Sequence, residues 1–178
     1  MSDRRRRFED LFGEVYEPLQ RYARRRTDPA TADDVVADAL LVLWRRLDEV
    51  PDGAALPWCY GVARRCLANR RRGVDRQTQL VDRLMGERPS APTEADPVLH
   101  EALASLDADD REIVRLWAWE QLPPREIAVV LGISANAAAI RVHRAKSRLT
   151  TALVGKKRLG AGHEQVGTTT AAFDKEAM

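Results

Sequence analysis

One segment near the C-terminal end of the sequence has the residue types and spacing for binding polyanions. No acidic residue occurs between Glu126 and Glu164, while basic residues recur through this interval: Arg141, Arg144, Lys146, Arg148, Lys156, Lys157 and Arg158. A solvated helix normally mixes charges of both signs, whereas a surface of one sign attracts phosphate groups. The segment therefore favours nucleic-acid binding, and the alternative is a core helix with a basic solvent face.

The residues around this segment predict a helix-turn-helix. Pro124 suits the first position of a helix, Gly132 suits a left-handed residue that ends it, and Ser134 can cap the next helix. That helix, from Ala135 to about Thr151, places small and apolar residues on one face: Ala138, Val142, Ala145 and Leu149. Its other side carries Asn136, Ile140, Arg141, His143, Arg144 and Arg148. Such a helix fits the major groove, where Arg reaches phosphates or guanine and Asn reads adenine.

A second basic track lies in the N-terminal half of the chain. Pro57 can begin a helix whose inward face carries Cys59, Val62, Ala63 and Cys66. The outward track combines arginines with two aromatic residues at its entrance: Arg64, Arg65, Arg71, Arg72, Trp58 and Tyr60. An unpaired nucleic-acid strand requires charge for its phosphates and flat rings for its bases. The alternative is that Trp58 and Tyr60 belong to the core.

A third candidate surface lies on the helix expected from Thr31, as its cap, to about Asp48. Its apolar residues cover a broad inward arc and leave one outward line: Asp34, Asp38, Leu41 and Arg45. This line could dock onto a basic partner surface. It could equally be an ordinary solvated face, since single exposed leucines are common.

The sequence offers no constellation for catalysis or metal binding. It contains no nucleophile with a matching base and no phosphate-cradling glycine loop, and its three histidines lack zinc-ligand spacing. Cys59 and Cys66 share a helix face but are too far apart to bond within it, so we expect buried thiols. We expect neither enzymatic activity nor a cofactor nor a metal site.

Length and composition favour two small helical domains. The chain has 178 residues, 44% of them apolar and only 6% aromatic, and alternating β-type patterns are scarce. The net charge of +2 means that nucleic-acid affinity must come from local clustering. No apolar run is long enough to span a bilayer and no signal peptide is evident, so we expect a cytoplasmic protein.

Turn residues divide the chain. Pro18 should kink or restart the first helix, which spans residues 8–26, and Asp107 should cap the helix that carries Arg111 to Glu120. Residues 73–95 lose apolar periodicity and gather Gly and Pro, which predicts a flexible linker. The Gly- and Thr-rich tail after residue 155 is expected to be disordered.

Three stretches resemble bacterial RNA polymerase sigma factors of the extracytoplasmic-function (ECF) group. Residues 105–149 are similar to the domain that reads the -35 promoter element: SLDADDREIVRLWAWEQLPPREIAVVLGISANAAAIRVHRAKSRL. Residues 32–50 resemble the helix that binds the clamp of core RNA polymerase: ADDVVADALLVLWRRLDEV. Residues 56–72 resemble the segment that contacts and melts the -10 element: LPWCYGVARRCLANRRR.

The resemblance implies a division of labour along the chain. Residues 1–73 would bind core polymerase and recognise and melt the -10 element, 74–96 would be a linker, 97–155 would read the -35 element, and 156–178 would be a tail. It further implies promoter DNA and core RNA polymerase as partners and, as for many family members, an anti-sigma factor. The rival hypothesis is a stand-alone helix-turn-helix regulator with an N-terminal ligand or dimerisation domain.

Overall fold

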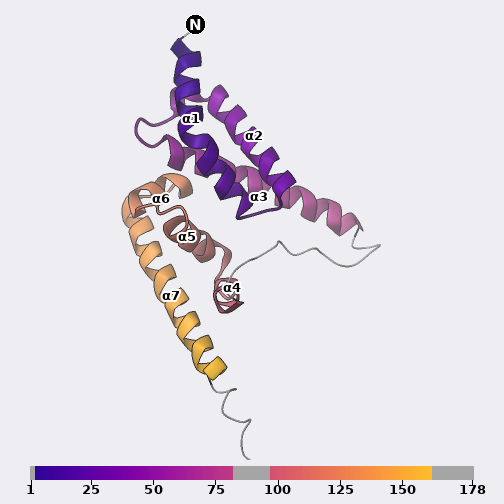
Figure 1. Cartoon of the computed structure of the whole chain (residues 1–178), viewed down its shortest axis with the longest axis vertical. Coiled ribbons are helices and arrows are strands. Elements are labelled where there is room, and N and C mark those ends of the chain that lie inside the picture. Colours follow the sequence, from indigo (N-terminus) through magenta and orange to yellow (C-terminus); the bar gives the residue numbers. More distant parts are fainter. Residues whose placement is uncertain (1–2, 82–96, 162–178) are drawn as a thin grey trace, which may run out of the picture.

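The fold is built from helices packed in two groups (Figure 1). The structure, a computed structural model, describes residues 3–81 and 97–161, and no strand occurs in either range. The N-terminal unit contains α1 (Asp3–Arg24), α2 (Pro29–Arg45), a short 3-10 helix (Leu47–Glu49) and α3 (Ala55–Val81). The C-terminal unit contains α4 (Pro97–Ala104), α5 (Ala108–Ala118), α6 (Pro124–Leu131) and α7 (Ala135–Ala161). The predicted all-α class is confirmed.

Helix α1 is continuous through Pro18, so the expectation that it restarts there is wrong. Proline inside a helix costs about 3 kcal/mol because it removes a hydrogen bond and crowds the preceding turn. Val15 and Leu19, on either side of it, are fully buried against the rest of the N-terminal unit. Their packing offsets the cost of the proline, and the alternative expectation of a kink at Pro18 stays a prediction.

Helix α2 begins one turn earlier than the sequence indicated. Asp28 is its N-cap and accepts a hydrogen bond from the Thr31 backbone N–H at 3.0 Å, and Pro29 takes the first helical position. The prediction that Thr31 is the cap is therefore wrong. The Asp28 side chain accepts from an unpaired amide of the first turn, and the fixed φ of Pro29 matches the first helical position.

Helices α3 and α7 are longer than their sequence patterns predicted. Helix α3 runs to Val81, past Gly73, where the linker was expected to begin. A glycine inside a helix costs only about 1 kcal/mol, which the surrounding residues can offset. Helix α7 runs to Ala161, so the first residues of the tail expected to be disordered are helical. The remainder of both predictions, residues 82–96 and 162–178, lies outside the described residues.

The predicted helix-turn-helix is present in α6 and α7, whose axes bend by 105°. Pro124 takes the first position of α6, and Gly132 ends it with a φ of 67°. The Ser134 hydroxyl accepts a hydrogen bond from the Ala137 N–H at 3.2 Å, and Asp107 caps α5 by accepting from the Asp110 N–H at 2.7 Å. These local predictions are confirmed.

The two units lie against each other, with α6 beside α3 (Figure 1). The backbones come close at Gly61 of α3, where an added Cβ would sit 3.1 Å from the carbonyl oxygen of Val130 in α6. Only glycine permits backbones to come this near. Among the helices of the described ranges, none is by itself long and apolar enough to cross a membrane, and only α6 and α7 taken together as a bent pair reach that length and composition.

Candidate nucleic-acid and polymerase interfaces

The solvent face of α7 carries most of the residues predicted to read duplex DNA. Ala138, Val142 and Ala145 are buried against the C-terminal unit, which turns the opposite face outward. That face exposes Asn136, Ile140, Arg141, His143 and Arg144. Ile140 is 44% exposed, so its side chain is accessible to a partner.

Two arginines on this face lack an acidic partner in the part of the chain that the structure describes. Arg141 and Arg144 make no ion pair with any residue that the structure describes. Their guanidinium groups are fixed to a rigid helix and remain free for phosphate or guanine, which are preferred partners of arginine in the major groove.

Arg148 differs from its neighbours because it is already paired. Its guanidinium contacts Asp107 at 3.2 Å and also binds Asp110, which is buried. Both carboxylates belong to the first turn of α5 and its cap, so Arg148 fastens α7 to α5. Its predicted DNA contact therefore competes with an ion pair inside the unit. Lys146, on the other flank, lies 3.9 Å from the centroid of the exposed Trp117 ring.

The second basic track, on α3, is largely occupied in this arrangement. Arg64 is bonded to Asp109 of the C-terminal unit at 3.4 Å, Arg71 donates to the backbone carbonyl of Arg26 at 3.2 Å, and Arg72 donates to Asn69 at 2.5 Å. Arg65 is exposed. Four arginines thus follow α3 as predicted, but they are not equally available.

The two aromatic side chains at the start of this track are not fully exposed. Tyr60 is only 3% exposed and stacks on Tyr22 with ring centroids 4.8 Å apart. Burial raises the pKa of its hydroxyl to about 12. Trp58 is half-buried, with the Arg46 guanidinium 5.8 Å from its ring centroid. Tyr60 therefore lies in the core, which was the alternative interpretation. Its ring would have to move away from Tyr22 before it could stack on a base.

The outward line on α2 has one unpredicted partner. Arg70 of α3 donates to Asp34 at 3.0 Å and to Asp38 at 2.7 Å, so one guanidinium binds both carboxylates. Leu41 is 53% exposed, and the Arg45 side chain is exposed and unpaired among the described residues. Sequence reasoning missed Arg70 because nothing in a sequence pairs residues of two separate helices.

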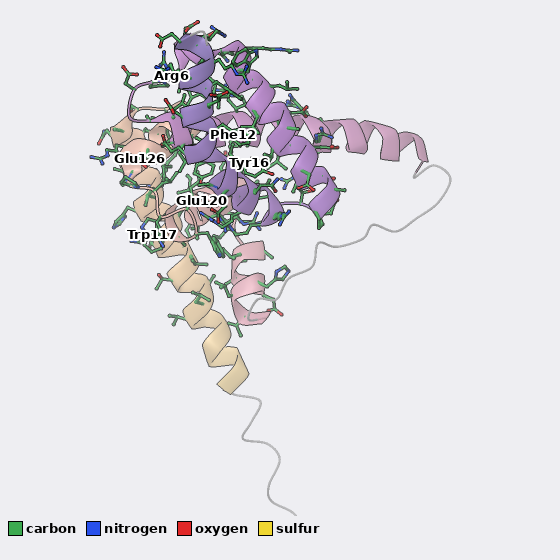
Figure 2. The ribbon with its side chains drawn as sticks, turned by 45° about the horizontal axis from the view of Figure 1, so that its top comes forward. Arg6, Phe12, Tyr16, Trp117, Glu120 and Glu126 are labelled. Atoms are coloured by element: carbon green, nitrogen blue, oxygen red, sulfur yellow. The ribbon has the colours of Figure 1, made fainter. Side chains whose placement is uncertain are left out.

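An aromatic row beside this line was also missed as a surface. The rings of Phe8, Phe12, Tyr16 and Trp44 follow one another, with centroid distances of 5.0 Å for Phe12–Tyr16 and 5.1 Å for Phe8–Trp44. Phe12 and Tyr16 are 38% and 41% exposed, and both are labelled in Figure 2. The row extends the exposed apolar area of Leu41 across α1 and α2.

The thiols and the metal-ligand residues give no sign of chemistry. Cys59 is buried, Cys66 is half-buried, and neither is in a disulfide. Burial raises the pKa of the Cys59 thiol to about 12 and also raises that of Cys66. In residues 3–81 and 97–161, no three His, Cys, Asp or Glu side chains gather as a metal site would need.

Both units match known families in the same order as they occur in the chain. Residues 8–77 match the family described as Sigma-70 region 2, and residues 98–149 match Sigma-70, region 4. The chain is 31% identical over 153 residues to the ECF RNA polymerase sigma factor SigL of Mycobacterium tuberculosis, covering 80% of this chain and 86% of that protein. It is 32% identical to the RNA polymerase sigma factor CarQ of Myxococcus xanthus, with coverage of 80% and 86%.

Two solved structures share the fold. One is the sigma factor RpoE from Bartonella quintana in complex with the anti-sigma factor NepR, with a TM-score of 0.62, 24% identity, and coverage of 82% of this chain and 96% of that one. The other is CnrH in complex with the cytosolic domain of CnrY, with a TM-score of 0.58, 24% identity, and coverage of 83% and 88%. With both sigma regions matched and relatives above 30% identity covered over most of their length, the chain belongs to the ECF group of RNA polymerase sigma factors, non-enzymatic transcription factors that direct RNA polymerase to promoters.

Proposed function

We propose that this sigma factor divides promoter reading between two helices while α2 holds core RNA polymerase. In this assignment Asn136, Ile140, Arg141, His143 and Arg144 of α7 read the -35 element, with Arg148 at the edge of the contact. The arginines of α3, together with Trp58 and Tyr60, bind the -10 region as it melts. Leu41 and Arg45, flanked by Asp34 and Asp38, form the docking line for polymerase.

The observation that carries the proposal is the two-sided character of α7. One face is buried in the C-terminal unit, and the other presents two unpaired arginines, an exposed isoleucine and an asparagine on the second helix of a helix-turn-helix. A buried face fixes the rotation of the helix, and side chains on a fixed helix can be aimed at base edges. Within the described part of the chain, the two arginines have no acidic partner that would compete with DNA.

The test is run-off transcription with purified core polymerase on a library of promoters, comparing the wild-type chain with the double variant Arg141→Ala/Arg144→Ala. Loss of one base or phosphate contact costs about 1–3 kcal/mol, so we expect transcription from the selected promoters to fall by about tenfold or more while core binding is retained. The control is Arg5→Ala/Arg6→Ala, which removes the same charge from the exposed start of α1. Unaltered transcription by the α7 variant would refute the assignment.

The docking line is tested by a pair of matched substitutions. Leu41→Arg and Ile140→Arg place the same charge on exposed aliphatic positions of α2 and α7. We expect Leu41→Arg to weaken binding to core polymerase by about tenfold, since a charge is poorly tolerated at the centre of an apolar contact. Ile140→Arg should leave that binding intact and alter promoter use. Equal effects of both variants on core binding would argue against the α2 assignment.

The rival hypothesis of a stand-alone regulator makes a different prediction for DNA binding. Such a protein would bind its duplex tightly without polymerase, whereas the proposed sigma factor needs the polymerase to hold its two readers. A gel shift with the promoters selected above, run with and without core enzyme, separates the two hypotheses. We expect a stable complex only when core enzyme is present.

A further inference from the structure

Helix α5 packs across the buried face of α7 and contacts a cation on each side of it. Its cap and first turn bind Arg148 through Asp107 at 3.2 Å and through Asp110. Its last turn places the ring of Trp117 against Lys146, whose ammonium lies 3.9 Å from the ring centroid. Residues two positions apart on a helix point about 200° apart around its axis. Lys146 and Arg148 therefore lie on opposite flanks of the exposed face of α7.

The two partners that α5 supplies differ in charge. A carboxylate neutralises the cation that it binds, whereas an aromatic ring attracts a cation through its quadrupole and leaves the unit charge in place. Arg148 can contact DNA only in competition with its ion pair. Lys146 has no acidic partner in residues 3–81 and 97–161. Its charge is therefore available to a phosphate while the ring holds the side chain.

The flank that carries Lys146 has little other means of binding DNA. A helix in the major groove lies between two phosphate backbones, one on each side. Arg141 lies on the same flank as Arg148, and the neighbours of Lys146 along its own flank, Ala135 and Ala139, are uncharged. A contact from α7 to the backbone on that side therefore depends on Lys146.

The Trp117 ring reduces a cost that is large for lysine. A lysine side chain is a flexible four-carbon stem, and fixing it in one position loses conformational entropy. A side chain that is already held in place has less freedom to lose when it binds. Trp117 is 39% exposed and is labelled in Figure 2, so its ring lies at the surface, where it can hold Lys146 within reach of a ligand.

We propose that Trp117 is a positioning residue for promoter binding, and that its ring holds the Lys146 ammonium against a phosphate of the DNA backbone beside the -35 element. Lys146 makes the contact, and Trp117 acts through it. This inference rests on the proposed function of α7 as the reader of the -35 element. It adds a contact that fixes the position of α7 in the groove, because phosphate contacts set the register of a protein on DNA and carry no sequence information.

The test measures the affinity of the holoenzyme, assembled from core polymerase and the full chain, for a promoter selected by run-off transcription. Fluorescence anisotropy is recorded at several KCl concentrations. Lys146→Gln removes the charge, Trp117→Leu removes the ring, and Trp117→Phe keeps a smaller ring. The matched control is Trp119→Leu, since Trp119 is also 39% exposed and no cation lies over its ring in the described part of the chain. Circular dichroism and core binding confirm that each variant is folded and assembled.

Lys146→Gln should weaken binding by about tenfold and reduce the slope of log affinity against log salt by about one, as the loss of one phosphate contact requires. Trp117→Leu should weaken binding by about threefold, the size of an exposed cation–π contact, and Trp117→Phe should restore most of this loss. When Lys146 is already replaced by Gln, Trp117→Leu should change affinity no further, because the ring acts only through the lysine. Trp119→Leu should match the wild type.

The outcomes separate this inference from the function on which it rests. Arg141→Ala/Arg144→Ala, measured on the same promoter, tests the -35 assignment itself. If that variant loses affinity while Lys146→Gln keeps the wild-type affinity and salt slope, the phosphate contact is overturned and the -35 assignment stands. If Trp117→Leu lowers affinity equally with and without Lys146, the positioning role is overturned. If all of these variants bind as the wild type does, the proposed function of α7 fails together with the inference.

Discussion

In the docking line proposed for α2, Arg70 distinguishes residues that already have a partner from residues that do not. Its guanidinium bonds to Asp34 and Asp38 together. Exposed ion pairs contribute about 0–1 kcal/mol to stability, so a partner can replace this one. Leu41 and Arg45 have no ion pair to break in the part of the chain that the structure describes. The first contact of α2 with polymerase should therefore be made by Leu41, with the carboxylates engaging after Arg70 yields.

Cys59 has a residue-scale consequence that can be measured directly. Burial raises its pKa to about 12, against about 8.5 for a free thiol, so almost no thiolate exists near pH 8 in the folded protein. We expect iodoacetamide to alkylate Cys59 slowly in the native chain and rapidly in denaturant, measured by mass spectrometry after digestion. Cys66, which is less buried, should react faster and serves as the internal reference. Equal native rates would contradict the burial.

The same shift gives stability a pH dependence. Since the folded thiol keeps its proton while the unfolded thiol loses it above about pH 8.5, the stabilisation is complete below that pH and is lost as the pH rises toward about 12. Burial of Tyr60 acts in the same direction above about pH 10. Cys59→Ala should remove the first part of this decline in urea titrations at increasing pH.

Two helices of the C-terminal unit, α5 and α6, are each followed by a residue with positive φ. Glycine adopts this conformation easily, and a residue with a side chain does not. Gly132 closes α6 with a φ of 67°, and Gln121 follows α5 with a φ of 55°. The Leu122 N–H bonds to the Leu116 carbonyl at 3.1 Å, which requires this left-handed residue. A side chain at positive φ costs about 1 kcal/mol relative to glycine.

These two ends make opposite predictions for stability. Gln121→Gly should raise the free energy of unfolding by up to about 1 kcal/mol, and Gly132→Ala should lower it by about 1 kcal/mol. Urea denaturation followed by circular dichroism measures both. An unchanged midpoint for Gly132→Ala would show that α6 can end without a left-handed residue.

Local signals predicted the elements well, and long-range contacts could not be predicted. Asp107, Pro124, Gly132 and Ser134 act within a few residues of themselves, so the helix-turn-helix could be located from the sequence. The failures at Pro18, Thr31 and the ends of α3 and α7 arise where packing or a competing local cap decides a boundary. The pairs Arg70 with Asp38 and Tyr22 with Glu112 join residues 32 and 90 positions apart, which no pattern in one sequence reveals.

At the scale of the whole molecule, the sequence predicted two DNA-binding units joined by a tether, and the structure adds the contact between them. The tether alone would give an effective concentration of one unit near the other. The contact of α6 with α3, together with the ion pairs of Arg26 with Glu112 and Glu120, turns that proximity into a defined arrangement of the two units.

Gly61 allows the contact between α3 and α6 to be tested without changing a charge. The atoms nearest to an added Cβ are the Val130 oxygen at 3.1 Å, the Val130 Cα at 3.5 Å and the Val129 oxygen at 3.7 Å, all backbone atoms of α6. Backbone cannot swing aside as a side chain can, so Gly61→Leu should wedge α6 away from α3. Gly73→Leu is the control, since it makes the same change in the same helix where nothing lies within 4 Å.

Both substitutions replace a helical glycine and should favour α3 locally by about 1 kcal/mol, so a difference between them reports the contact alone. Gly61→Leu should enlarge the radius of gyration in small-angle X-ray scattering and split urea unfolding into two transitions, because units that no longer share an interface unfold independently. Gly73→Leu should keep the wild-type profile and a single transition. If Gly61→Leu remains as compact as Gly73→Leu, the approach of α3 to α6 is not what holds the two units together.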